Sequence, residues 1–131
     1  MVEIITPAYH YIQDIAPGIN TSPEQLEADI RSLIDRGFTF LTASEVVTAY
    51  KNDDLPSKTA MLSFDDGLKS QYSAARILEK LGIRATYFVI TSTFDGKFPP
   101  VMALQFLIQQ LGAESLHPII QDLLPPAYAK L

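Results

Sequence analysis

The stretch AMLSFDDGLKS, residues 60–70, decides how the rest of the sequence is interpreted. A nearly continuous apolar run, KTAMLSF (58–64), ends in two adjacent carboxylates, Asp65 and Asp66, and then in a glycine. Continuous rather than alternating apolar residues are typical of a parallel strand that is covered on both faces. Gly67 would let the backbone turn sharply into a following helix. The stretch therefore predicts a buried parallel strand with two acidic residues at its carboxyl end.

The flanking segments predict an alternation of helices and parallel strands. Strands are expected at 3–8, 38–42 and 84–90, and helices at 23–36, 43–51 and 69–81. The first helix has Ser22 at its N-cap and Pro23 at its first position, and Gln25 is expected to complete a capping box. Thr42 and Glu45 suggest a second capping box. Strand, helix and strand around the central stretch have the length of one βαβ unit, which is roughly 30 residues. The expected fold class is α/β, with parallel strands and flanking helices.

The two longer helices each carry one apolar stripe, and both stripes are expected to face the core. The stripes are Leu26, Ile30, Leu33 and Ile34 on the first helix and Tyr72, Ala75, Leu78 and Leu81 on the second. The pattern changes after residue 91. Segments 101–112 and 115–126 are expected to be strongly apolar helices with no strand between them, so their faces need a partner.

Length, charge and composition exclude several classes of protein. The chain has 131 residues, which is enough for one domain at most. Its net charge is −5 and it has no cluster of Lys and Arg, which argues against a nucleic-acid surface. It has no cysteine, so disulfides and thiolate metal sites are excluded. No signal peptide is recognisable and no apolar run reaches the ~18 residues of a membrane span, so a soluble cytoplasmic protein is expected.

The acidic pair is a candidate site because ligands of α/β proteins collect at the carboxyl ends of parallel strands. Two carboxylates a few ångströms apart repel each other unless a cation intervenes. A divalent metal would remove this conflict, with one aspartate as its ligand and the other as a base acting on water. Carboxylate and imidazole ligands suit Zn, Co, Ni, Fe or Mn. The alternative is a solvated turn, for which Asp-Asp-Gly is a common sequence.

The two histidines are not equally good candidates for site residues. His10 follows the first predicted strand, and it emerges at the same rim as Asp65 if that strand is parallel to the central one. Without that condition a packed or surface histidine explains it better. His117 lies in an apolar helical segment and is interpreted as structural or exposed. Asp53 and Asp54 are interpreted as solvated loop residues.

Several segments, in this order, resemble the N-terminal half of the polysaccharide deacetylases, the NodB-homology group of carbohydrate esterase family 4. They are YH (9–10), SPEQLEADIRSLIDRGFTFLTASEVV (22–47), AMLSFDDG (60–67) and RILEKLGIRATYFV (76–89). The resemblance extends from about residue 7 to residue 91 and implies part of a distorted (β/α) barrel. Ser63 stands where the family's Thr-Phe-Asp-Asp-Gly motif has threonine.

The resemblance implies a hydrolase that removes acetyl groups from N-acetylated sugars or polysaccharides, acting on non-peptide carbon–nitrogen bonds with the help of a divalent metal, zinc above all. By motif position, Asp65 would be the catalytic base and Asp66 a metal ligand, with His10 at the rim of the site. The family's His-x-x-x-His metal motif is missing, because the chain has only His10 and His117. Metal binding and catalysis by this chain alone are therefore expected to be weak or absent.

The incomplete motif set predicts a single partial domain over 1–131, with the N-terminal part of the barrel in 1–91 and a helical insertion or tail in 92–131. As a fragment or one half of a split enzyme, it would be completed by the C-terminal half of the domain or by a second copy of itself. The alternative is a non-catalytic remnant that acts as a carbohydrate-binding or interaction module. A phospho-acceptor domain with a Mg²⁺ pocket is disfavoured, because its acidic pair would lie near the first strand.

Overall fold

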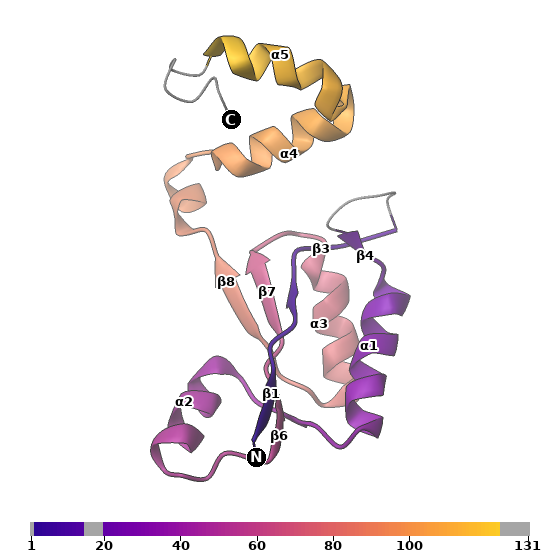
Figure 1. The fold of residues 1–131 in the computed structure, drawn as a ribbon, viewed down its shortest axis with the longest axis vertical. Helices are drawn as coiled ribbons and strands as arrows, with labels where there is room; N and C mark the ends of the chain where they lie inside the picture. The colour runs from indigo at the N-terminus through magenta and orange to yellow at the C-terminus, as the bar shows by residue number, and fades with distance from the viewer. Residues whose placement is uncertain (1, 15–19, 124–131) are drawn as a thin grey trace. The chain divides into compact units, whose positions relative to one another are not determined.

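The computed structural model describes residues 2–14 and 20–123 and confirms an α/β fold of parallel strands with flanking helices (Figure 1). The elements are β1 (Glu3–Ile5), β2 (Ala8–Tyr9), β3 (Tyr11–Ile12), β4 (Asn20–Thr21), α1 (Pro23–Asp35), β5 (Thr39–Phe40), α2 (Ala43–Lys51), β6 (Lys58–Ala60), β7 (Ser63–Asp66), α3 (Gln71–Leu81), β8 (Thr86–Val89), the 3-10 helix η1 (Thr91–Asp95), α4 (Pro100–Leu111) and α5 (Ala113–Leu123). The chain divides into two compact units between Val89 and Ile90.

In the first unit, the predicted strands 3–8 and 58–64 each consist of two short strands joined at a bend. β1 pairs with β6 and β2 pairs with β7, both in parallel. Hydrogen bonds continue across the bend, where the Met61 N–H donates to the Ile5 carbonyl (2.9 Å) and the Ser63 N–H to the Pro7 carbonyl (3.0 Å). Pro7 has no N–H of its own to add to the ladder. The sequence pattern predicted the strands, but not their division.

The central strand has parallel neighbours on both sides. β5 pairs with β6, and β8 pairs with β7 from Ser63–Thr86 to Asp66–Val89. The resulting strand orders are β1–β6–β5 and β2–β7–β8. The predicted parallel pairing of the central strand with the strand at 84–90 is therefore confirmed. It brings the carboxyl ends of β2, β7 and β8 to the same end of the sheet.

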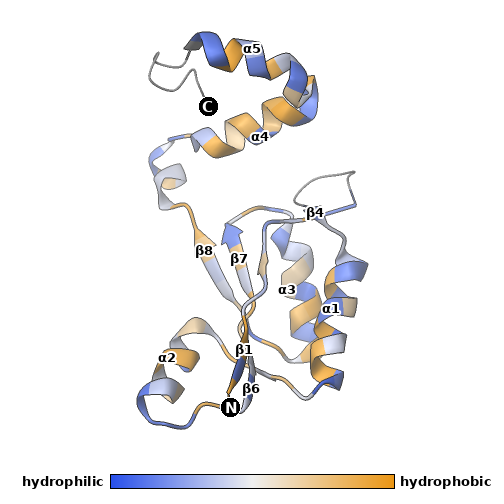
Figure 2. Ribbon diagram, viewed as in Figure 1, coloured by the Kyte–Doolittle hydropathy of each residue, from blue (hydrophilic) through white to orange (hydrophobic). Residues whose placement is uncertain are grey.

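The main core lies between these strands and the pair of helices α1 and α3, which lie side by side in Figure 1. Its buried residues are Ile12, Leu26, Ile30, Leu62, Phe64, Ala74 and Leu78. Figure 2 shows hydrophobic and hydrophilic residues alternating along both helices, as expected of helices with one buried face. The rings of Tyr9 and Tyr87 stack on Phe64 from either side, with centroid distances of 5.5 and 5.0 Å.

The helix ends confirm the predicted caps in part. The Ser22 hydroxyl accepts the Gln25 N–H (3.1 Å), but the Gln25 amide donates to Asp29 instead of returning to the N-cap, so the first capping box is incomplete. At α2 both arms of the predicted box between Thr42 and Glu45 are present. Gly82 ends α3 with a left-handed φ of 66°, as its position in the sequence indicates.

Two positions in the predicted apolar stripes are wrong. Ile34 is 42% exposed, because its position on α1 lies beyond the edge of the buried stripe formed by Leu26, Ile30 and Leu33. Tyr72 is 68% exposed, and the buried stripe of α3 runs instead through Gln71, Ala74 and Leu78. Apolar periodicity alone could not give this phase, because a glutamine occupies the first buried position.

The second unit contains the expected apolar helices α4 and α5, with no strand between them. α5 begins two residues earlier than predicted, so Pro118 lies near its middle, and the predicted end at 124–126 lies outside the described residues. Leu116 is its buried apolar residue. The exposed large apolar residues are Ile119 on α5 and, on α4, Val101, Leu104, Phe106, Leu107, Ile108 and Leu111. Within residues 2–14 and 20–123, no helix is long and apolar enough to cross a membrane.

Candidate functional site

The acidic pair occupies the last two positions of β7, where the sequence placed it. Asp66 and Gly67 both have left-handed backbones, with φ of 75° and 69°, and these two residues turn the chain from β7 towards α3. Aspartate is one of the few side chains that tolerate this region. At Gly67 a Cβ atom would lie 2.9 Å from Val89 Cγ1, so the loop packs against β8 without room for a side chain.

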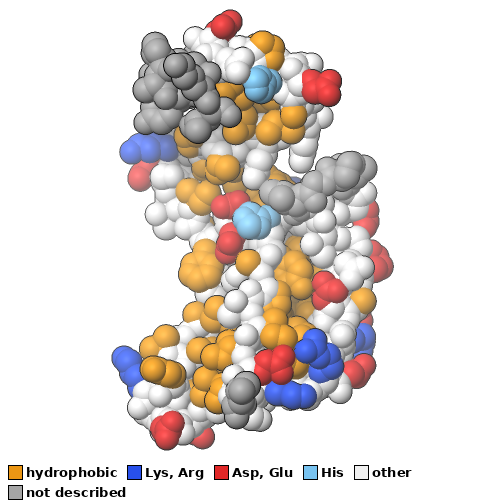
Figure 3. Space-filling view, in the orientation of Figure 1, with side chains coloured by type: hydrophobic (Ala, Val, Ile, Leu, Met, Phe, Trp, Pro, Cys, Tyr) orange, Lys and Arg blue, Asp and Glu red, His pale blue; other side chains and the backbone are white. Residues whose placement is uncertain are grey.

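His10 lies at the same end of the sheet as Asp65, as predicted. Its Nε2 atom is 3.9 Å from Asp65 Oδ2, and the two side chains are 36% and 33% exposed. The separation is too long for a hydrogen bond but within the range of an ion pair when the imidazole is protonated. Figure 3 shows imidazole and carboxylate side chains together on this face. Both groups are therefore open to solvent and to a ligand.

The second aspartate has a different neighbour. The pKa of the Tyr11 hydroxyl is raised, first by burial and then by the negative charge of Asp66. Asp66 has a left-handed φ of 75°, so the alternation of side chains along an extended strand does not apply to it. The carboxylate of Asp65 thus lies near the imidazole of His10, and the charge of Asp66 raises the pKa of the Tyr11 hydroxyl. The two carboxylates therefore have different neighbouring groups, an imidazole and a phenol.

A fourth residue of the site, Gln71, was not predicted from the sequence. Gln71, the first residue of α3, is 3% exposed, and its Nε2 atom donates to two backbone carbonyls, those of His10 (3.0 Å) and Asp65 (2.5 Å). A glutamine in phase with the buried positions 74 and 78 was the only signal for it in the sequence. Buried amides are stable only when hydrogen-bonded, so its partners had to lie close by.

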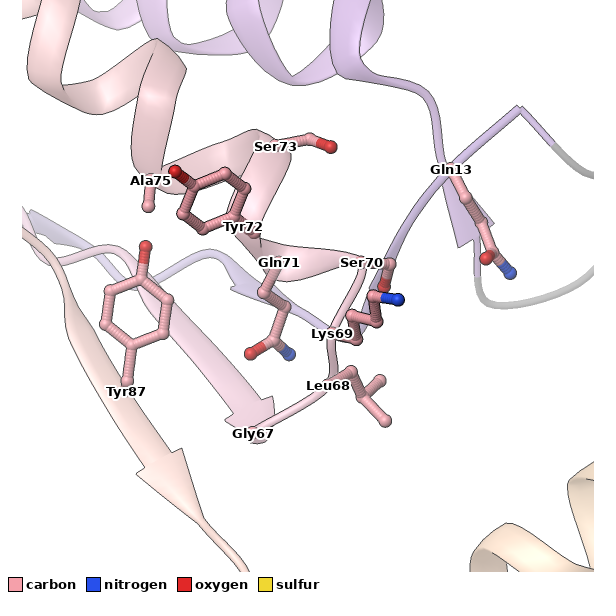
Figure 4. A pocket seen from close by; sticks show the side chains of 10 residues that line it. All are labelled: Gln13, Gly67, Leu68, Lys69, Ser70, Gln71, Tyr72, Ser73, Ala75 and Tyr87. Carbon is pink, nitrogen blue, oxygen red and sulfur yellow. The ribbon is translucent and has the colours of Figure 1, made fainter.

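An open cavity of about 1000 Å³ borders the loop after β7 (Figure 4). It is lined by Gln13, Gly67, Leu68, Lys69, Ser70, Gln71, Tyr72, Ser73, Ala75 and Tyr87. Tyr87 belongs to the ring stack with Phe64, which faces the helices, whereas Asp65 follows Phe64 by one residue and points to the opposite side. The cavity shares Gly67 and Gln71 with the acidic site, but neither Asp65 nor Asp66 is among its lining residues.

The described residues do not fit a complete metal site. No group of three or more His, Asp or Glu side chains in residues 2–14 and 20–123 is close enough to hold an ion. A catalytic zinc ion normally has three protein ligands and a water. His117 is exposed on α5, and Asp53 and Asp54 are exposed after α2, as the sequence indicated. The roles predicted for Asp65, Asp66 and His10 stay predictions.

Comparisons with known proteins agree on one family. The polysaccharide deacetylase family matches residues 52–115. YxkH of Bacillus subtilis, which carries a provisional polysaccharide deacetylase name, is 32% identical over 91 residues, covering 68% of this chain and 32% of that protein. IcaB from Ammonifex degensii is 26% identical with a TM-score of 0.63, covering 70% of this chain and 40% of that one.

A Streptococcus pyogenes deacetylase, PplD, solved in complex with acetate, is 28% identical with a TM-score of 0.57. The alignment covers 69% of this chain and 42% of that one. The chain thus spans 32% to 42% of the length of these three relatives.

Proposed function

Because the chain belongs to the polysaccharide deacetylase family, we propose that it carries part of a site that hydrolyses N-acetyl groups on sugars. The observation that supports this most is the arrangement at the end of β7, where Asp65 and Asp66 precede the turn at Gly67 and His10 faces Asp65 at 3.9 Å. The acetate bound to the similar PplD is the product that such a reaction would release. The substrate class would be an N-acetylated sugar or polysaccharide.

Asp65 is the base in this proposal. Its carboxylate is one-third exposed, so a water molecule can reach it, and the facing imidazole of His10 can stabilise its charge when protonated. The base takes a proton from water as the water oxygen attacks the acetamide carbonyl carbon. The carbon–nitrogen bond then breaks, the leaving nitrogen takes up the proton that Asp65 accepted from water, and acetate and a free amine result.

Asp66 is the proposed ligand of a divalent metal, with zinc first and Co, Ni, Fe or Mn as alternatives. A full set of ligands is not found among the described residues, so weak binding is expected of this chain alone. We place the remaining ligands in a C-terminal half of the domain or in a second copy of the chain. No step of the reaction above is assigned to the metal.

The same proposal includes a distorted (β/α) barrel of which the first unit is one part. In the described part of the chain, β8 pairs with β7 alone, and Tyr87, Phe88 and Val89 are each more than one-third exposed. Apolar residues exposed on both faces of an edge strand favour further strands and helices beside it. Barrel closure would supply both.

A chimera tests the proposal. Residues 1–89 would replace the matching segment of the Bacillus subtilis relative, and acetate release from N-acetylated chito-oligosaccharide would be measured, with the intact relative as the positive control. We expect activity that Asp65→Asn abolishes and that the control Asp53→Asn, in an exposed loop, leaves unchanged. A folded chimera without activity, beside an active relative, would contradict the proposal and favour a non-catalytic carbohydrate-binding or interaction module.

A further inference from the structure

We propose that Gln71 is a positioning residue that holds His10 and Asp65 opposite each other. This inference rests on the proposed role of Asp65 as the base. One amide nitrogen of Gln71 donates to the backbone carbonyls of both residues, at 3.0 Å for His10 and 2.5 Å for Asp65. These are the same two residues whose side chains lie 3.9 Å apart. A single buried side chain thus joins the end of β7 to the segment after β2.

Strand pairing does not fix the backbone of His10. The described register of β2 with β7 ends at Tyr9 and Phe64, and His10 lies between β2 and β3. The hydrogen bond from Gln71 acts where that ladder stops. Ser70, the residue before Gln71, adds a second hydrogen bond to the same segment, because its hydroxyl accepts the Ile12 N–H at 3.3 Å. The start of α3 therefore holds the segment that carries His10.

The burial of Gln71 also favours a positioning role over ordinary packing. Its phase on α3 places it in the core stripe, where an apolar side chain would avoid the cost of desolvating an amide. A leucine or methionine there could fill space but could not bond the two carbonyls. The direction of the His10 and Asp65 side chains depends on their backbones, and Gln71 holds both of those backbones.

Gln71→Met tests the donor directly, because methionine keeps the length of the side chain and removes its N–H groups. The matched control is Gln25→Met on α1, where the exposed glutamine amide donates to Asp29 at 2.7 Å. Gln71→Asn is a milder second variant. Its amide is one methylene shorter, so it cannot reach both carbonyls without movement of α3.

The readout is the imidazole ¹H–¹⁵N spectrum of the full chain, in which His10 and His117 are the two histidines. In the wild type, Asp65→Asn should shift the His10 signals, because it removes a charge near Nε2. In the Gln71→Met background most of that shift should be lost, and Gln71→Asn should reduce it. The Gln25→Met background should retain it, and the His117 signals should not move in any variant. An unchanged His10 response in a folded Gln71 variant would overturn the inference.

A second measurement needs no variant at this position. The side-chain amide protons of Gln71 should exchange with solvent more slowly than those of Gln25 in the wild-type chain. Equal exchange would overturn the inference even if Gln71→Met failed to fold. Both measurements are independent of acetate release. An active chimera that tolerates Asp65→Asn would refute the proposed function while leaving the coupling of Gln71, His10 and Asp65 intact.

Discussion

Gly67→Ala should destabilise the protein more than Gly82→Ala, although the two glycines have nearly the same backbone. Their φ values are 69° and 66°, so an L-residue at either position meets the left-handed penalty of about 1 kcal/mol. They differ in their surroundings. Nothing lies within 4 Å of a Cβ at Gly82, whereas a Cβ at Gly67 would lie 2.9 and 3.3 Å from the two γ-methyl carbons of Val89.

The contact with Val89 sets the size of the difference. Val89 is 48% exposed, so its side chain can rotate away, at the cost of an off-rotamer χ1 of about 1 kcal/mol. The expected losses in the free energy of unfolding are therefore about 2 kcal/mol for Gly67→Ala and about 1 kcal/mol for Gly82→Ala. Urea unfolding of each variant, followed by circular dichroism and extrapolated to zero denaturant, measures both values.

The double variant identifies the cause. In a Val89→Ala background the γ-methyl groups are gone, and Gly67→Ala should then cost no more than Gly82→Ala does. Equal losses for the two glycines in the wild-type background would refute this reasoning. So would an excess at Gly67 that persists after Val89→Ala.

Three further predictions concern the core and the helix caps. Burial, and then the charge and hydrogen bond of Asp29, raise the pKa of Tyr9 from 10.0 to about 12, so the stability that this shift contributes is complete below about pH 10 and is lost between pH 10 and 12. In urea unfolding at stepped pH, Tyr9→Phe should therefore lose less stability over this range than the wild type does. Equal losses in the two proteins would contradict this. Thr42→Ala removes the hydroxyl that accepts the Glu45 N–H and should cost about 1 kcal/mol, whereas Thr42→Ser should cost much less. Phe64→Ala leaves a cavity at a fully buried ring and should cost about 3–5 kcal/mol in urea unfolding, and a loss below that of Thr42→Ala would argue against its central place in the core.

The sequence predicted most of what depends on local chemistry. Caps and breakers such as Pro23, Thr42 and Gly82 act within one helical turn, so the helix ends are close to those expected. The apolar run before Asp65 gave the central parallel strand and the end at which the acidic pair lies. The common rim of His10 and Asp65 followed from parallel pairing alone.

The features that were missed depend on contacts between distant segments. The division of the central strand between β6 and β7, where its outer partner changes from β5 to β8, has no local signature in the apolar pattern. The burial of Gln71 depends on a carbonyl 61 positions away along the chain. The same contact explains why Tyr72 is exposed although the apolar pattern predicted it to be buried, because Gln71 takes the buried position instead.

Calorimetric titration of the chain with Zn²⁺ tests the central claim most directly, namely that these residues carry only part of a metal-dependent deacetylase site. The described residues offer Asp66 and the His10–Asp65 pair rather than a three-ligand set, so we expect weak heats with no saturating one-to-one transition. Asp66→Ala should then change the titration little. Tight one-to-one binding that Asp66→Ala abolishes would contradict the account, because it would show that the chain completes its own metal site.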